Sequence, residues 1–369
     1  MNAVNESDDR QFMQQALDLA SRGCGQVEPN PMVGCVIVQQ GEVVGSGFHA
    51  EYGGPHAEVV ALQEAGDRAQ GATLYVTLEP CCHQGKTPPC TDAVIRAGIA
   101  RVVAAQQDPF PHVNGLGAER LRAAGIDVRI GVLGESAREL NAPYRKLVQR
   151  TQPWVMAKWA MTWDGKLATR RRDSQWISCE ASRQAVHQLR GRVDAIVVGI
   201  GTVLADDPLL TARPPGTRVA RRVVVDWEAL TPLNSKLVQS AHDVPVVIVV
   251  SDRAAASRMQ LLEQAGCKVV GCSGVDERQR LDAMLSWMGR QRWTNVLVEG
   301  GSGLLGSLFD ARAIDEVHVF IAPKLVGGAE ALTPVGGLGL EQIATAATLR
   351  TVQWSLVDTD IYLMGRVDY

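Results

Sequence analysis

Short valine-rich runs alternate with helix-like segments along almost the whole chain of 369 residues. The runs are roughly four to eight residues long and continuously apolar, without alternating polar residues. The segments between them carry apolar residues at the spacing of an amphipathic helix. Continuous apolar strands separated by helices are typical of parallel sheets that are covered on both faces. The pattern therefore predicts an α/β fold with largely parallel sheets in both halves of the chain. The expected strands are 33–38, 73–78, 101–105, 128–130, 195–198, 222–225, 246–250, 268–270, 295–298 and 316–321.

The chain is also divided by composition. At roughly 100–200 residues per domain, its length suits two domains. All eight tryptophans lie from Trp154 onward, whereas four of the seven histidines precede residue 113. Polar residues and prolines in 141–153 interrupt a helical pattern just before a new strand begins. We therefore expect two domains, 1–148 and 149–369.

Charge and cysteine content narrow the class of protein. A formal net charge of -3 with 46% hydrophobic residues indicates a soluble globular protein with no polyanionic or membrane partner. No apolar run is long enough for a membrane span, and the polar, acidic start is unlike a signal peptide. A cytoplasmic location is expected. In that reducing compartment, eight cysteines, five of them in the first 90 residues, point to metal ligands or buried thiols.

A metal site is predicted in the first half. His56 stands at the start of an expected helix, Cys81 follows an expected strand, and Cys90 begins another helix. One imidazole and two thiolates suit Zn²⁺ and leave its fourth tetrahedral position to water, as in catalytic zinc sites. Glu58 could then carry protons from that water to the substrate. Zinc nucleobase deaminases share this division of labour.

Several alternatives weigh against the catalytic zinc site. Zinc nucleobase deaminases pair H-x-E with P-C-x-x-C, whereas eight residues separate Cys81 from Cys90 here. Cys82 could replace Cys81, although the Pro-Cys step favours Cys81. A closed structural site would need a fourth protein ligand, for which His83 is the nearest candidate. Cys24 and Cys35 are expected to be core thiols.

Three motifs of the first half closely resemble the deaminase domain of the RibD family of riboflavin biosynthesis proteins. These are 29–38, 56–59 and 77–90, and the resemblance covers residues 8–148. It implies a cytidine-deaminase-like three-layer αβα sandwich that removes, as ammonia, the 2-amino group of 2,5-diamino-6-(5-phosphoribosylamino)pyrimidin-4(3H)-one. The family usually reads Asp-Pro-Asn-Pro where this chain has Phe110 in the third position, so that polar contact is absent here. The substrate contacts implied by the resemblance are Asn30, His49, His83, Lys86 and Thr87.

The second half lacks a G-x-G-x-x-G motif in the strand-turn-helix context of a Rossmann fold. Two expected strands nevertheless end in glycine, at Gly199 and at Gly300-Gly301, and the second continues through 302–307 into a helix. Glycine at a strand-to-helix turn lets backbone N–H groups approach a phosphate. A tight turn without a ligand explains the same pattern equally well.

Five further motifs resemble the reductase domain of the same family: 159–166, 174–178, 201–213, 299–301 and 322–328. The resemblance covers about 150–369. It implies a dihydrofolate-reductase-like α/β domain that uses NADPH to reduce the ribosyl group of 5-amino-6-(5-phosphoribosylamino)uracil to ribityl. NADPH contacts would be Ala160, Trp176, Thr202, Asp206, Gly301, Ser302, Gly303, Leu304, Leu305, Gly306 and Ser307. Substrate contacts would be Ser174, Arg190, Leu210, Arg213 and Glu299.

The proton step of this reduction is left open between Lys158 and Glu299. Arg190 and Arg213 suit the substrate phosphate, because guanidinium pairs with phosphate through two parallel hydrogen bonds, but either could be an ordinary surface arginine.

The expected function is thus a bifunctional enzyme, a zinc deaminase (a hydrolase acting on a cyclic amidine) joined to an NADPH-dependent oxidoreductase. The alternative is a zinc nucleobase deaminase with a C-terminal nucleic-acid-binding domain. No basic stripe interleaved with aromatics favours that alternative. The expected partner is a phosphorylated pyrimidine, with no nucleic acid and no membrane, in a homo-oligomer for which a dimer is favoured.

Overall fold

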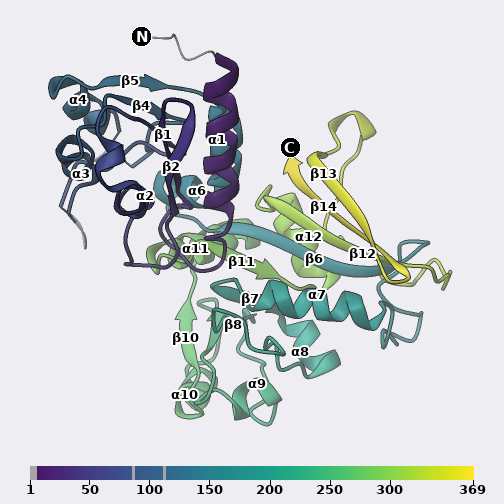
Figure 1. Cartoon of the computed structure of the whole chain (residues 1–369). Coiled ribbons are helices and arrows are strands. Elements are labelled where there is room, and N and C mark those ends of the chain that lie inside the picture. Colours follow the sequence, from purple (N-terminus) through teal and green to yellow (C-terminus); the bar gives the residue numbers. More distant parts are fainter. Residues whose placement is uncertain (1–5, 85–87, 111–113) are drawn as a thin grey trace. The chain divides into compact units, whose positions relative to one another are not determined.

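Two units, Met1–Thr151 and Gln152–Tyr369, each built on its own β-sheet, make up the computed structural model of the chain (Figure 1). The structure describes residues 6–84, 88–110 and 114–369. Helices cover both faces of each sheet, so the predicted α/β class is confirmed. No helix in these described ranges is long and apolar enough to cross a membrane.

The first unit has a five-stranded sheet in the order β2-β1-β3-β4-β5. Strands β3, β4 and β5 are parallel, and β1 is antiparallel to both β2 and β3. The sequence pattern did not predict β2, which returns from β1 through Gln40 and Gly41, both with positive φ, as a tight hairpin turn requires. The strands are β1 Gly34–Gln39, β2 Glu42–Phe48, β3 Thr73–Val76, β4 Arg101–Ala104 and β5 Asp127–Ile130.

Three layers form around this sheet. Helices α2, α3 and α4 pack on one face, and α1 and α5 pack on the other. The layers approach closely, because a Cβ on Gly34 of β1 would lie 2.0 Å from the carbonyl oxygen of Ala16 in α1. The helices are α1 Glu6–Ser21, α2 Ala57–Ala65, η1 Gly66–Ala69, α3 Cys90–Arg96, α4 Leu116–Ala123, α5 Gly134–Leu140 and α6 Ala142–Arg150.

A buried carboxylate fastens α1 to the sheet. Asp9 is fully buried and accepts hydrogen bonds from Tyr75 Oη at 2.9 Å and from Arg101 at 2.8 and 2.9 Å. Arg129 adds a contact of 3.1 Å to the same carboxylate. A buried charge with this many charged hydrogen bonds is compensated, whereas removing one side would leave the other unpaired.

The second unit has a nine-stranded sheet in the order β10-β9-β8-β7-β11-β6-β12-β14-β13. Every pair from β10 to β12 is parallel, and β14 runs antiparallel to both β12 and β13. The strands are β6 Trp154–Thr162, β7 Ala195–Gly199, β8 Arg221–Val225, β9 Val246–Val250, β10 Lys268–Gly271, β11 Asn295–Val298, β12 Glu316–Ala322, β13 Thr348–Val357 and β14 Asp360–Asp368.

Helices α11 and α12 cover one face of this sheet, and α9, α10 and the apolar residues of α7 and α8 cover the other. The helices are α7 Glu180–Arg190, α8 Ile200–Asp206, α9 Lys236–Gln239, α10 Ala256–Gln264, α11 Glu277–Arg290, α12 Ser302–Asp310 and η2 Ile343–Thr345.

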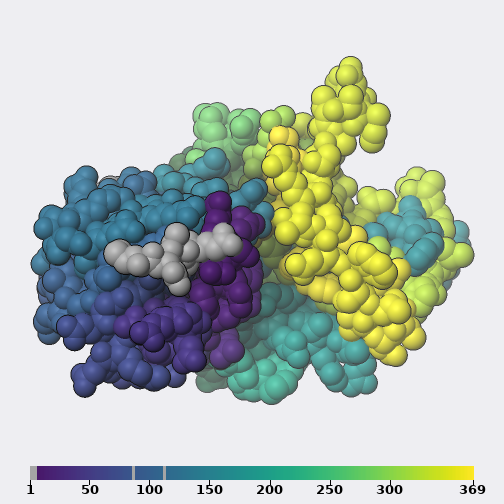
Figure 2. Space-filling model, turned by 45° about the horizontal axis from the view of Figure 1, so that its top comes forward, coloured from purple at the N-terminus to yellow at the C-terminus, as the bar shows by residue number. Residues whose placement is uncertain are grey.

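The hairpin of β13 and β14 lies at the surface of the second unit, at the yellow end of the colour scale in Figure 2. The sequence pattern did not predict it. Strand β13 forms the edge of the sheet, and its Trp354 and Leu356 are 72% and 70% exposed. An edge strand that exposes large apolar side chains is a surface on which another protein chain can pack.

The burial of the two cysteines that precede the metal-ligand candidates can be compared with the expectation for them. Cys35 is fully buried, as expected. The expectation for Cys24 was wrong, because it is exposed in the turn that follows the end of α1 at Ser21.

Candidate active sites

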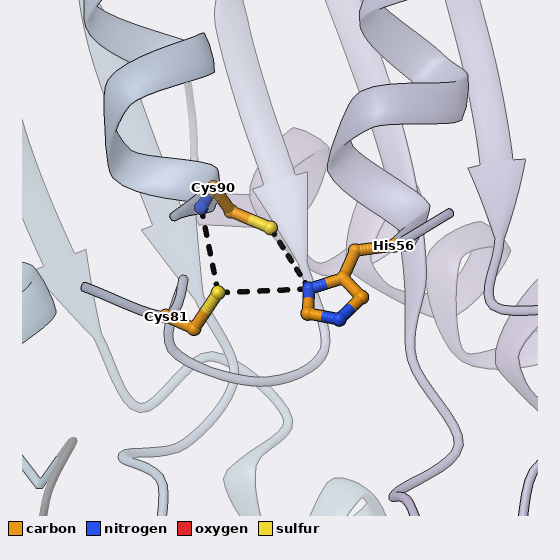
Figure 3. Close-up of side chains that lie close together, drawn as sticks. All are labelled: His56, Cys81 and Cys90. Atoms are coloured by element: carbon orange, nitrogen blue, oxygen red, sulfur yellow. Dashed lines mark hydrogen bonds between the residues drawn. The ribbon is translucent and has the colours of Figure 1, made fainter. Parts of the chain in front are cut away.

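Three metal-ligand side chains converge in the first unit. His56 immediately precedes α2, Cys90 is the first residue of α3, and Cys81 lies in the segment that follows β3 (Figure 3). His56 Nδ1 lies 3.1 Å from Cys90 Sγ and 3.5 Å from Cys81 Sγ. All three ligand atoms fall within 4.8 Å of one another. One nitrogen and two sulfurs in this arrangement fit a tetrahedral zinc ion with a fourth position open.

The polar surroundings of Cys81 favour its thiolate. Hydrogen bonds from the Cys90 thiol and from His56 lower the pKa of Cys81 well below its ordinary value. The Cys90 backbone N–H also donates to Cys81 Sγ at 3.4 Å. The neighbouring thiolate in turn raises the pKa of Cys90. One metal ligand is thus ionised at neutral pH, which metal binding requires.

Glu58 lies in the first turn of α2, beside these ligands, and is buried. Burial, with the nearby Cys81 thiolate, raises the pKa of the Glu58 carboxyl to about 7. A carboxyl group with a pKa near neutrality is suited to accept and release protons.

Two of the five expected substrate contacts lie beside the metal ligands. Asn30 Nδ2 is 3.2 Å from His49 Nε2, and the His49 ring packs edge-on against His56 at 5.5 Å between centroids. His49 Nδ1 is 2.9 Å from the carbonyl oxygen of Pro55. Burial lowers the pKa of His49, which favours its neutral form.

The other expected contacts are more peripheral. His83 is exposed and packs against Phe110 with 6.1 Å between ring centroids. Lys86 and Thr87 lie outside the described residues. Among the described residues, the metal-ligand group consists of His56, Cys81 and Cys90 and does not include His83.

Glu79 connects the segment that carries Cys81 to the loop before α4. Its carboxylate accepts backbone N–H bonds from Asp108 at 3.3 Å and from Gly115 and Ala118 at 2.9 Å. Helix α4 therefore docks close to the metal ligands: a Cβ on Gly117 would lie 2.1 Å from the Pro80 carbonyl oxygen.

Asn141 and Tyr144 also support this site, although the sequence suggested only a domain boundary there. Asn141 Oδ1 accepts the Met32 N–H and its Nδ2 donates to the Met32 carbonyl, both at 2.8 Å. These bonds fix the segment two residues after Asn30. Tyr144 Oη donates to Asp108 Oδ1 at 3.0 Å, and burial raises the pKa of Asp108 to about 6.

In the second unit, a buried ion-pair cluster forms between β6, the end of α7 and the end of β11. Glu299 Oε2 lies 3.1 Å from Lys158 Nζ, while Arg190 grips both carboxylate oxygens at 2.5 and 2.8 Å. The Glu299 side chain is only 4% exposed. Although burial alone would raise it, the two cations lower the pKa of Glu299 to about 2.

This cluster bears on two expectations. Because Glu299 is ionised at neutral pH, it cannot donate a proton there. Arg190 donates hydrogen bonds from Nε and Nη2 to the Glu299 carboxylate and from Nη1 to the Thr211 carbonyl oxygen at 3.3 Å. The substrate phosphate expected at Arg190 could therefore bind only to its remaining N–H groups.

The segment 207–213 approaches this cluster. Leu210 has a φ of 51° and its side chain is 3% exposed, so only its main chain can face a ligand. Arg213 is exposed. Ser174 is half-buried, and Trp176 is 63% exposed with the Arg183 guanidinium 4.8 Å above its ring.

The expected cofactor residues fall into two groups. Thr202 of α8 lies beside the turn at Gly301, where a Cβ would be 3.2 Å from Thr202 Oγ1. The helix α12 begins at Ser302, and Ser302 and Gly303 remain accessible. In contrast, Leu304, Leu305 and Gly306 are buried, and the two leucine side chains belong to the core. Ala160 and Ser307 are half-buried, and burial raises the pKa of Asp206.

Two family models match the chain. The cytidine and deoxycytidylate deaminase zinc-binding region matches residues 6–106, and the RibD C-terminal domain matches residues 153–363. Neither model covers the stretch that contains Asn141 and Tyr144.

Relatives match over nearly the full length. The riboflavin biosynthesis protein RibD of Actinobacillus pleuropneumoniae is 42% identical over 98% of this chain and 96% of its own. That of Escherichia coli K12 is 39% identical over 96% of this chain and 98% of its own.

Solved structures agree. RibD of Acinetobacter baumannii superimposes with a TM-score of 0.86 at 35% identity, covering 99% of this chain and 100% of that one. The deaminase/reductase of Thermotoga maritima gives a TM-score of 0.82 at 33% identity, covering 98% of this chain and 99% of that one. The cytidine-deaminase-like and dihydrofolate-reductase-like folds implied by the resemblance are thereby confirmed. With both domains matched in order along one chain, this protein is a member of the RibD family of bifunctional riboflavin biosynthesis enzymes, a deaminase followed by a reductase.

Proposed function

We propose that residues 1–148 deaminate 2,5-diamino-6-(5-phosphoribosylamino)pyrimidin-4(3H)-one and that residues 149–369 reduce the resulting 5-amino-6-(5-phosphoribosylamino)uracil with NADPH. Membership of the RibD family supports both reactions. The convergence of His56, Cys81 and Cys90 is the observation that carries the proposal, since a tripodal site with an open position is the minimum that zinc hydrolysis needs.

In the deaminase, His56, Cys81 and Cys90 would hold the zinc ion. When bound, Zn²⁺ acidifies water so that hydroxide is available at neutral pH. Glu58 would carry one proton of that water to the ring nitrogen and the other to the departing amino group, which leaves as ammonia. Asn30 and His49 would bind and orient the pyrimidine, with His83, Lys86 and Thr87 completing the substrate site.

In the reductase, bound NADPH would be the source of the hydride for C1′ of the ring-opened ribosyl group. The imine nitrogen at C1′ then requires one proton. We assign its delivery to Lys158 Nζ, because the alternative donor, Glu299, is held ionised by Lys158 and Arg190. Glu299 would hold Lys158 in place through their ion pair.

We assign the remaining contacts of the reductase according to which of the expected residues are accessible to a ligand. The turn at Gly301 with Ser302, Gly303 and Ser307 would receive a cofactor phosphate, and Ala160, Trp176, Thr202 and Asp206 would contact the rest of NADPH. Leu304, Leu305 and Gly306 could contribute main chain only. Ser174, Arg190, Arg213 and Glu299, with the main chain of Leu210, would bind the substrate.

The protein would act in the cytoplasm on a small phosphorylated pyrimidine, not on nucleic acid. We further propose a homodimer, since the exposed β13 edge with Trp354 and Leu356 offers an apolar surface for a second copy.

The test is turnover with the full chain. Ammonia release from the diaminopyrimidine, followed by NADPH oxidation when the cofactor is added, is the expected result. Glu58→Gln should abolish ammonia release with about one zinc per chain still bound by elemental analysis. The exposed Glu119→Gln is the matched control. Absence of both reactions, together with binding to single-stranded nucleic acid, would instead favour a polymer-acting deaminase.

A further inference from the structure

A buried arginine of the second unit lacks the carboxylate that such a group normally needs. Arg222, on β8, is 0% exposed and is the largest fully buried side chain of the described residues. No carboxylate in the described part of the chain lies within ion-pair distance, and Asp243 acts on it only at longer range. Burying a charge without a counter-charge is unfavourable unless hydrogen bonds compensate for the lost hydration. The hydrogen-bond partners of Arg222 therefore decide what it contributes.

The hydrogen bonds of Arg222 join two chain segments. Its Nη1 donates to the Leu209 carbonyl at 3.3 Å and to Ser240 Oγ at 2.7 Å. Its Nη2 donates to the Ser240 carbonyl at 2.9 Å and to the Val244 carbonyl. Its Nε has no partner. The guanidinium is therefore a clamp between the segment 207–213 and the turn 240–244.

The far side of the same segment is held by another guanidinium. The Thr211 carbonyl accepts a bond from Arg190 Nη1 at 3.3 Å and lies 3.2 Å from His187 Nδ1. Leu210, which has a left-handed φ, thus lies between two carbonyl groups with fixed hydrogen bonds. Arg222 of β8 holds the preceding carbonyl, and Arg190 of α7 holds the following one. A left-handed leucine is a strained conformation that its surroundings must impose.

We propose that Arg222 is a positioning residue of the reductase. By holding Leu209 it sets the conformation of segment 207–213, so that the Leu210 main chain and the Arg213 side chain face the substrate beside the cluster of Arg190, Glu299 and Lys158. This rests on the proposed reductase function. The role separates Arg222 from a purely structural residue, because loss of its guanidinium would leave the Leu209 carbonyl without its bond and would therefore alter substrate binding as well as stability.

The experiment measures both activities on the same preparations of the full chain. Arg222→Met should raise KM for 5-amino-6-(5-phosphoribosylamino)uracil by about ten- to a hundredfold, the effect of losing one charged hydrogen bond. The KM for NADPH should change less than about twofold, and ammonia release should not change. Arg222→Lys, which keeps the charge but not the fork, should give an intermediate KM.

Two further variants separate an effect on substrate binding from a failure to fold. Arg221→Met is the matched control, because Arg221 is the adjacent, exposed arginine of the same strand and stacks on Trp293 instead. Ser240→Ala removes one acceptor of the clamp without touching segment 207–213, and should raise the substrate KM by about three- to tenfold. It serves as the deciding variant if Arg222→Met does not fold.

The outcomes distinguish this inference from the function on which it rests. If the unaltered protein does not oxidise NADPH with this substrate, the proposed reductase function fails. If it does, and Arg222→Lys and Ser240→Ala retain its substrate KM and kcat while only lowering the unfolding temperature, Arg222 is merely structural and the inference is overturned.

Discussion

Replacing Glu299 by glutamine should destabilise the second unit in a pH-dependent way. The carboxylate lies between Lys158 and Arg190, and its pKa in the folded chain is about 2 against an ordinary 4.5. That difference corresponds to about 3 kcal/mol of unfolding free energy at neutral pH. It agrees with the roughly 3–5 kcal/mol lost when one partner of a buried ion pair is removed.

The sign of the pH dependence follows from the lowered pKa. A carboxylate that is easier to ionise in the folded chain stabilises it fully above the unfolded pKa of 4.5, and this stabilisation is lost as the pH falls toward 2. The difference in unfolding free energy between the unaltered protein and Glu299→Gln should therefore be about 3 kcal/mol at pH 7 and about half of that at pH 3.

Urea unfolding followed by tryptophan fluorescence measures this gap. All eight tryptophans lie between Trp154 and Trp354, so the signal reports on the second unit alone. The exposed Glu330→Gln should show no gap at either pH. A gap below about 1 kcal/mol at pH 7, or one that does not narrow on acidification, would refute the ionised cluster and with it the assignment of the proton step to Lys158.

Two other changes test the first unit. Asp9→Asn leaves Arg101 and Arg129 without their shared carboxylate and should cost about 3 kcal/mol of unfolding free energy; circular dichroism during urea unfolding measures this, and a loss under 1 kcal/mol would contradict it. Gly117→Ala forces a Cβ against the Pro80 carbonyl, so it should lower the unfolding free energy by about 1–3 kcal/mol. It should also lower the zinc content found by elemental analysis. Full zinc occupancy would show that α4 does not position the ligands.

Most of the strands that the sequence predicted are buried on both faces, although β5 and β10, which are partly exposed edge strands, were predicted as well. A run such as 246–250 is apolar at every position because neighbours and helices surround it. Strand β2 was missed because Gly45 and Gly47, which admit α2 at close range, interrupt its pattern. Strand β13 was missed because nearly all of it is exposed, so burial leaves no mark on its sequence.

The candidate sites divide in the same way. His56, Cys81 and Cys90 were predicted because a metal demands particular atoms, and few residue types supply them. Asn141 and Arg222 could not be predicted, because their roles depend on contacts that only the fold creates. Asn141 meets Met32 across 109 positions of sequence, and nothing near either residue marks the pairing.

Asn141 and Tyr144 set a lower limit on how far a self-standing hydrolytic fragment can be shortened. Ending the chain at residue 106, where the match to the zinc-binding family stops, would remove Asn141, whose amide completes the hydrogen bonding of Met32, together with the hydrogen-bonded pair of Tyr144 and Asp108. Such a truncated chain would keep its metal-ligand residues but lose the hydrogen bonds that position the segment of Asn30. A truncation for biotechnological use should therefore retain α6 in full, through Arg150.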